Sequence, residues 1–163
     1  MAEATSVEPS LSASGKLLPV RVCTVLRASI LSATEMDDTP IPITARPMSI
    51  EERSILARLL EFDFPGSEGL RAQVPFVSVV GVCPCGCVTR ELKVDRAQVP
   101  PAPGVSSPIP GEAEIPTRGG DYGGGIIAFA KDGYLSSLEA YSHDVEPIRS
   151  WPPMDVLIFR SRG

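Results

Sequence analysis

The sequence predicts an α+β domain in which two N-terminal helices pack on an antiparallel sheet of about four to five strands made from two hairpins. Three observations predict it. A capped amphipathic segment begins at Ser49, two β-rich runs flank a turn that holds three cysteines, and an Asp-Gly pair at 132–133 separates two further β-like runs. Two short helices with a tight joint must cover an apolar surface, and the predicted sheet supplies it.

The first helix is predicted over about residues 50 to 61. Ser49 and Glu52 form a capping box, in which the serine hydroxyl accepts the N–H of Glu52 and the glutamate returns to the N–H of Ser49. The residues that follow place one apolar stripe at helical spacing, made of Ile55, Leu56, Leu59 and Leu60. This stripe is a core face and shows no sign of a cofactor site.

A second, shorter helix is expected after the Pro65-Gly66 turn, capped by Ser67 and ended by Pro75. The run from Phe76 to Val82 is β-rich and bounded by turn residues, so we expect a strand there. A second strand is expected over residues 88–94, which gives an antiparallel hairpin around Cys83-Pro84-Cys85-Gly86-Cys87.

The second hairpin is predicted from Ile126–Ala130 and Leu135–Ser142, since Asp132-Gly133 between β-like runs is a strong turn signal. The apolar run at 156–159 is expected either to add an edge strand or to pack on the core. Trp151, between prolines, is expected to anchor this tail by burying its ring.

Two segments are expected to lie outside the regular structure. Residues 1–47 are interpreted as a disordered or weakly ordered N-terminal extension, so the single α+β domain is predicted to cover residues 48–163. Residues 96–124 are rich in proline and glycine, which predicts a mobile surface loop. The glycines at 119–125 are interpreted as a linker, because no helix follows them to hold a phosphate.

A pattern G-x-L-x-x-L-E-x-Y-x-x-D-x-E-P-I covers the second hairpin and is made of Gly133, Leu135, Leu138, Glu139, Tyr141, Asp144, Glu146, Pro147 and Ile148. With the capped helix and the Cys/Gly-rich turn in the same order, it resembles a small uncharacterised family of bacterial α+β proteins over about residues 48 to 153. That family has no assigned activity, so the resemblance implies a fold and no function.

Composition argues against several classes of function. The net charge is −5 and no basic run occurs, so we do not expect nucleic-acid binding. No apolar stretch reaches the length of a membrane span, and Glu3 and Glu8 precede any lysine or arginine, which argues against a signal peptide. We therefore expect a cytoplasmic protein with no membrane contact, where stable disulfides are uncommon.

The cysteine turn has three interpretations. Cys83, Cys85 and Cys87 could bind a metal with His143 as fourth ligand, and zinc is then the metal expected, although the C-x-C-x-C spacing differs from the usual C-x₂₋₄-C knuckle. Alternatively, the cysteines are small residues that fill a tight, partly buried turn. Redox chemistry would need a depressed thiol pKa and a resolving partner. Cys23 is the only other soft ligand in the chain.

No firm catalytic set is found. The chain has one histidine, no G-x-S-x-G elbow and no phosphate loop, and an enzyme using Cys85 or Cys87 with His143 is the least favoured hypothesis. The polar residues of the second hairpin predict an interaction face, made of Glu139, Tyr141, Asp144 and Glu146. We therefore expect a non-enzymatic protein-binding module with an unknown protein partner, with a zinc-stabilised metal-binding protein as the alternative.

Overall fold

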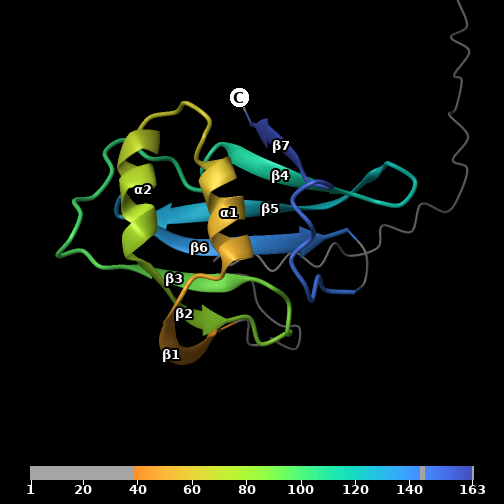
Figure 1. Ribbon diagram of the computed structural model, residues 1–163, viewed down its shortest axis with the longest axis horizontal. Coiled ribbons are helices and arrows are strands. Elements are labelled where there is room, and N and C mark those ends of the chain that lie inside the picture. The colour runs from red at the N-terminus through yellow and green to blue at the C-terminus, as the bar shows by residue number, and fades with distance from the viewer. Residues whose placement is uncertain (1–38, 144–145, 163) are drawn as a thin grey trace, which may run out of the picture.

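The chain folds into a seven-stranded antiparallel sheet with α1 and α2 on one of its faces (Figure 1). This is a computed structural model, and it describes residues 39–143 and 146–162. The strands lie in the order β1-β2-β3-β6-β5-β4-β7. The elements along the chain are β1 (Ile41–Pro47), α1 (Ile50–Leu59), α2 (Ser67–Gln73), the 3-10 turn η1 (Val74–Phe76), β2 (Val77–Val82), β3 (Arg90–Val94), β4 (Gly111–Pro116), β5 (Tyr122–Lys131), β6 (Tyr134–Ser142) and β7 (Ile158–Ser161).

The predicted fold class is wrong in the size of the sheet and in its balance with the helices. Two helices packed on about four to five strands were expected, whereas seven strands form the sheet and the two α-helices have 10 and 7 residues. Both predicted hairpins are present, as β2–β3 and β5–β6. The difference comes from β1, β4 and β7, which extend the sheet on both sides of those hairpins.

Strand β1 lies in residues 1–47, which were interpreted as a disordered or weakly ordered N-terminal extension. It pairs antiparallel with β2 and forms one edge of the sheet. Proline is tolerated at an edge because the missing N–H removes no interior ladder bond. Residues 41–47 of the predicted extension therefore belong to the sheet, and residues 1–38 lie outside the described residues.

Strand β4 lies inside the predicted proline-rich loop and pairs with β5 on one side and with β7 on the other. Ala113 is fully buried, whereas Glu112 and Glu114 lie on the opposite face. Ion pairs join them to β7 and to the residue that follows it, with Arg160 Nη2 at 3.0 Å from Glu114 Oε2 and Arg162 Nε at 3.2 Å from Glu112 Oε2. Charged and apolar residues therefore alternate along β4, as in a strand with one buried face, although prolines lie at both of its ends.

The rest of the predicted loop packs against the domain. Val99, Ala102 and Ile109 are buried. The N–H of Ala102 donates to the carbonyl of Gly133 at 2.8 Å, and the N–H of Ile109 donates to that of Ala128 at 3.0 Å. The prediction of a mobile surface loop is therefore wrong for residues 99–116, which contact the domain through buried apolar side chains, backbone hydrogen bonds and strand β4.

The core lies between the helices and one face of the sheet. The capping box of α1 is present, with Ser49 Oγ accepting from the N–H of Glu52 at 3.2 Å. The predicted stripe is confirmed, since its four members are fully buried: Ile55, Leu56, Leu59 and Leu60. They pack against Ile126, Ala128, Leu138 and their neighbours on the central strands. Trp151 is partly buried against the same core, as expected.

The two hairpins position the cysteine turn. β2 and β3 are joined through residues 83–89, so the turn leaves one central strand and enters the next. β3 then pairs with β6 through Arg90↔Leu138 and Glu91↔Ser137. The turn of the second hairpin has Asp132 at φ 54° and Gly133 at φ 77°, the left-handed pair that a tight hairpin requires.

Candidate metal centre

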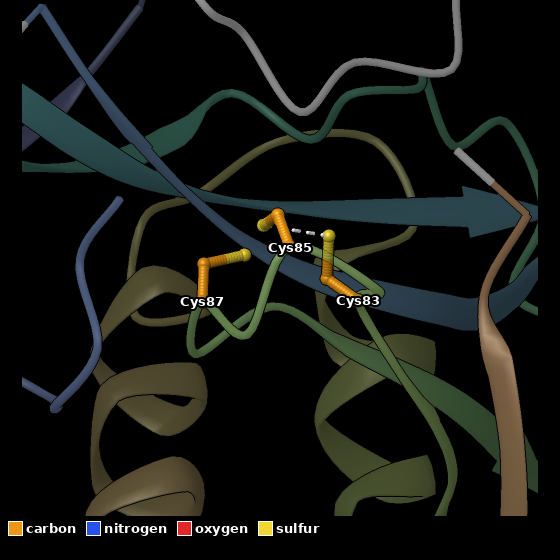
Figure 2. A group of neighbouring side chains, drawn as sticks. All are labelled: Cys83, Cys85 and Cys87. Carbon is orange, nitrogen blue, oxygen red and sulfur yellow. Dashed lines mark hydrogen bonds between the residues drawn. The ribbon is translucent and has the colours of Figure 1, made fainter. Parts of the chain in front are cut away.

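The three cysteine side chains of the β2–β3 connection converge on one another (Figure 2). The Sγ atoms of Cys83, Cys85 and Cys87 all lie within 4.8 Å of one another, and those of Cys83 and Cys85 are 3.0 Å apart. In an extended strand, alternate side chains would lie about 6 to 7 Å apart on one face. The folded turn therefore brings the thiols closer than sequence spacing alone would.

Backbone hydrogen bonds hold the turn in this shape. The N–H of Gly86 donates to the carbonyl of Cys83 at 3.1 Å, and Gly86 has a φ of 78°, which favours glycine. The N–H of Val88 donates to the carbonyl of Ile148 at 2.9 Å, which ties the end of the turn to a segment about 60 residues later.

Two guanidinium groups flank the turn. Arg90 Nη1 donates to the carbonyl of Cys87 at 3.2 Å, and Arg90 Nε donates to Glu52 on α1 at 3.0 Å. On the other side, a Cβ added to Gly86 would lie 3.0 Å from Nη1 of Arg149. Arg90 therefore contacts the turn while its charge is paired with Glu52, and Arg149 lies next to Gly86 in the middle of the turn.

The cysteine cluster is close enough to bind one metal ion. Cys83 and Cys87 are 7% and 5% exposed, and Cys85 is half-buried, so the group is partly shielded from water while remaining accessible through Cys85. Thiolates are soft ligands that suit zinc and other thiophilic metals. The cluster of three cysteines is the arrangement in the described chain that fits a metal.

His143 does not belong to this cluster. Its ring lies 4.9 Å from that of Tyr122 and 5.9 Å from that of Tyr141, measured between ring centroids. The backbone N–H of His143 donates to the carbonyl of Gly123 at 3.0 Å. The histidine is therefore held at the open end of the β5–β6 hairpin, among tyrosines. Cys23, the other soft ligand, lies outside the described residues.

Glu139 lies on β6 on the face opposite the core and is only 7% exposed. Burial, together with the charges of Glu91 and Cys87, raises the pKa of Glu139 to about 7, against a hydrogen bond from Ser137 Oγ at 3.0 Å that lowers it. Burial likewise raises the pKa of Glu91. The first carboxylate of the predicted interaction face is therefore a buried acid beside the cysteine turn.

The other members of the predicted interaction face are dispersed. Tyr141 is half-buried and donates to Oε1 of Glu112, which also accepts from Tyr122 at 3.0 Å. Burial, with this carboxylate, raises the pKa of Tyr141. Glu146 is exposed, and Asp144 lies outside the described residues.

Sequence reasoning missed the residues that support the cysteine turn. Arg90 lies within the strand that was predicted over residues 88–94, and Arg149 and Glu52 lie far from the turn in sequence. The sequence explains Glu52 as part of the capping box. Nothing in the sequence indicates that Glu52 also accepts hydrogen bonds from Arg46 and Arg90. These contacts join elements that are distant in sequence, so local patterns could not predict them.

Comparison of the chain with protein-family models, with curated proteins and with solved structures gives no match. The resemblance to a bacterial family stays a prediction. In the described part of the chain, no helix has the length and apolar character that crossing a membrane requires.

Proposed function

We propose that the protein binds a zinc ion through Cys83, Cys85 and Cys87. The observation that carries this proposal is the convergence of three Sγ atoms within 4.8 Å. In a tetrahedral site with Zn–S bonds of about 2.3 Å, sulfur ligands lie about 3.8 Å apart. This separation falls between the 3.0 Å of the Cys83–Cys85 pair and the 4.8 Å limit of the group, so small side-chain rotations would suffice.

Charge at the turn also supports the proposal. Three thiolates with one divalent cation carry a net charge of −1, and Arg90 and Arg149 flank the same turn. Arg90 is already paired with Glu52, so Arg149, which forms no ion pair within the described residues, is the guanidinium that would favour the deprotonated thiols that a metal needs. Three cysteines leave one of zinc's usual four positions to another donor.

The role that fits this site is structural. The cysteines lie in the connection between two central strands, and a metal there would cross-link residues 83–87 within the β2–β3 hairpin. Because the binding free energy of a structural zinc is coupled to folding, metal loss would lower the stability of this hairpin. Zinc binding should also be weaker at low pH, because a thiol must lose its proton before it can bind the metal.

Elemental analysis of purified protein under reducing conditions tests the proposal. The wild-type protein is expected to hold about one equivalent of zinc. The Cys83→Ser/Cys87→Ser variant should lose it, whereas His143→Gln, which alters a soft ligand outside the cluster, should keep it. Zinc content that does not change in the double serine variant would contradict the proposal, as would wild-type protein that binds no zinc.

A protein-interaction role for the face of Glu139, Tyr141, Asp144 and Glu146 stays a prediction. Of the described members, Glu146 is exposed, and Glu139 and Tyr141 already have hydrogen-bond partners within the chain. Affinity capture from the native host, compared between wild type and Glu146→Gln, tests it. A partner retained equally by both proteins would not bind through Glu146.

A further inference from the structure

A groove opens on the sheet where β3 and β6 separate. The two strands are registered only at Arg90↔Leu138 and Glu91↔Ser137. Beyond these pairs, residues 92–94 of β3 and 134–136 of β6 line a groove of about 730 Å³. This volume lies in the range of small-molecule sites, which is about 300 to 1,000 Å³. Its apolar lining includes Phe76, Val80, Leu92 and Leu135.

Three cations line the same groove. They are Lys93, Arg96 and Lys131. Within the described residues, none of the three forms an ion pair, whereas Arg46, Arg58, Arg90, Arg160 and Arg162 all do. Arg96 instead lies over the ring of Tyr134, with Cζ 4.4 Å from the ring centroid. In a chain of net charge −5, uncompensated cations gathered at one apolar groove mark a local site for an anion.

Two carboxylates, Glu91 and Asp95, also line the groove. Asp95 accepts the N–H of Ala97 at 3.1 Å, which closes the turn after β3. The three cations therefore exceed the acids of the groove by one, and none of them forms an ion pair with either acid within the described residues.

We propose that this groove binds a small organic anion that has an apolar body and one acidic head group. The body would lie on Phe76 and Val80, the partly exposed apolar side chains of the lining, where burial of apolar surface supplies binding energy. The head group would lie near Lys93 and Lys131, with Arg96 held by Tyr134. This site is separate from the cysteine cluster, so it does not depend on the proposed zinc binding.

Fluorescence titration with 8-anilinonaphthalene-1-sulfonate, an apolar body with one sulfonate, tests the proposal on the full chain. N-phenyl-1-naphthylamine, which lacks the sulfonate, serves as the neutral probe. Each exposed cation contributes about two- to fivefold to affinity, so Lys93→Gln/Lys131→Gln should weaken sulfonate binding by about five- to twentyfold. The neutral probe should bind both proteins within about twofold, because its contacts are apolar.

Arg53→Gln/Arg118→Gln is the charge-matched control, since both residues are exposed, form no ion pair within the described chain and do not line the groove. It should change sulfonate binding by less than about twofold. Equal losses in the two double variants would overturn the proposal, because only net charge would then matter. Backbone amide shifts of the wild-type protein on adding the sulfonate give a second readout. Shifts confined to residues outside 76–80, 91–97 and 131–136 would also overturn it.

Discussion

The carboxylate of Glu52 on α1 accepts a hydrogen bond at 3.0 Å from Nε of Arg90, the first residue of β3. Arg46 on β1 binds the same carboxylate, with Nη2 2.7 Å from Oε1. Glu52, the glutamate of the α1 capping box, therefore joins the edge strand β1 to β3, the strand that leaves the cysteine turn. Because Arg90 also donates to the carbonyl of Cys87, this pair connects helix α1 to the candidate metal centre.

Replacing Glu52 with Gln should destabilise the protein strongly at neutral pH. The Glu52 side chain is 2% exposed, and the change would leave Arg90 without its buried anionic partner. We expect the free energy of unfolding to fall by about 2 to 4 kcal/mol in urea denaturation. Glu51→Gln, at an exposed position one residue earlier, is the matched control and should cost less than about 1 kcal/mol.

The pH dependence of this difference follows from the pKa of Glu52. Burial would raise that pKa, but hydrogen bonds from Arg46 and from the N–H of Ser49 outweigh it and hold the pKa at about 2. A depressed pKa contributes stability that is present above the ordinary value of 4.5 and is lost as pH falls toward 2. The gap between wild type and Glu52→Gln should therefore narrow over that range. A gap independent of pH would contradict the ion-pair explanation.

Glu139 should give the opposite pH dependence. Its pKa is raised to about 7, so its contribution to stability is fully present below 4.5 and is lost as pH rises through 7. We expect about 1 to 3 kcal/mol of stability to be lost across this range in metal-free protein. In Glu139→Gln the loss should disappear, which urea denaturation at pH 5 and pH 8 would measure. Equal pH slopes in both proteins would show that Glu139 titrates normally.

Gly86→Ala should weaken zinc binding. Gly86 has a φ of 78°, and an added Cβ would lie 3.0 Å from Nη1 of Arg149. A left-handed conformation costs a non-glycine residue about 1 to 2 kcal/mol, so we expect an affinity loss of about tenfold in competition with a chelating dye. Gly120→Ala is the matched control, because Gly120 has a φ of 87° and no atom within 4 Å of its added Cβ. Equal losses of zinc affinity in the two variants would contradict a specific role of the Gly86 turn in zinc binding.

The elements that were predicted correctly carry strong local signals. Ser49 and Glu52 define the start of α1, and Asp132-Gly133 defines the turn of the β5–β6 hairpin. β4 was missed because Pro110 precedes it and Pro116 is its last residue, although Glu112 and Glu114 alternate with Ala113 and Ile115. Ion pairs with Arg160 on β7 and with Arg162 just after it stabilise that alternation, and these arginines lie about 46 to 50 residues later in the chain.

The candidate site could be predicted in part. The sequence places three cysteines in one turn between two strands, and the structure brings their sulfur atoms together. The grouping of His143 with these cysteines required the two hairpins to meet at that end. The last residues of β6 pair with the first residues of β5, as in Gly124↔Ser142. His143 therefore packs with Tyr122 and Tyr141. Such a contact depends on strand order, which local patterns do not determine.

X-ray absorption at the zinc edge of the zinc-loaded, reduced protein tests the central proposal most directly. Binding by Cys83, Cys85 and Cys87 predicts about three sulfur ligands at about 2.3 Å and one lighter donor. The Cys83→Ser/Cys87→Ser variant should show at most one cysteine ligand from the cluster. A first shell made only of nitrogen and oxygen at about 2.0 to 2.1 Å in the wild-type protein would contradict binding at the cysteine turn.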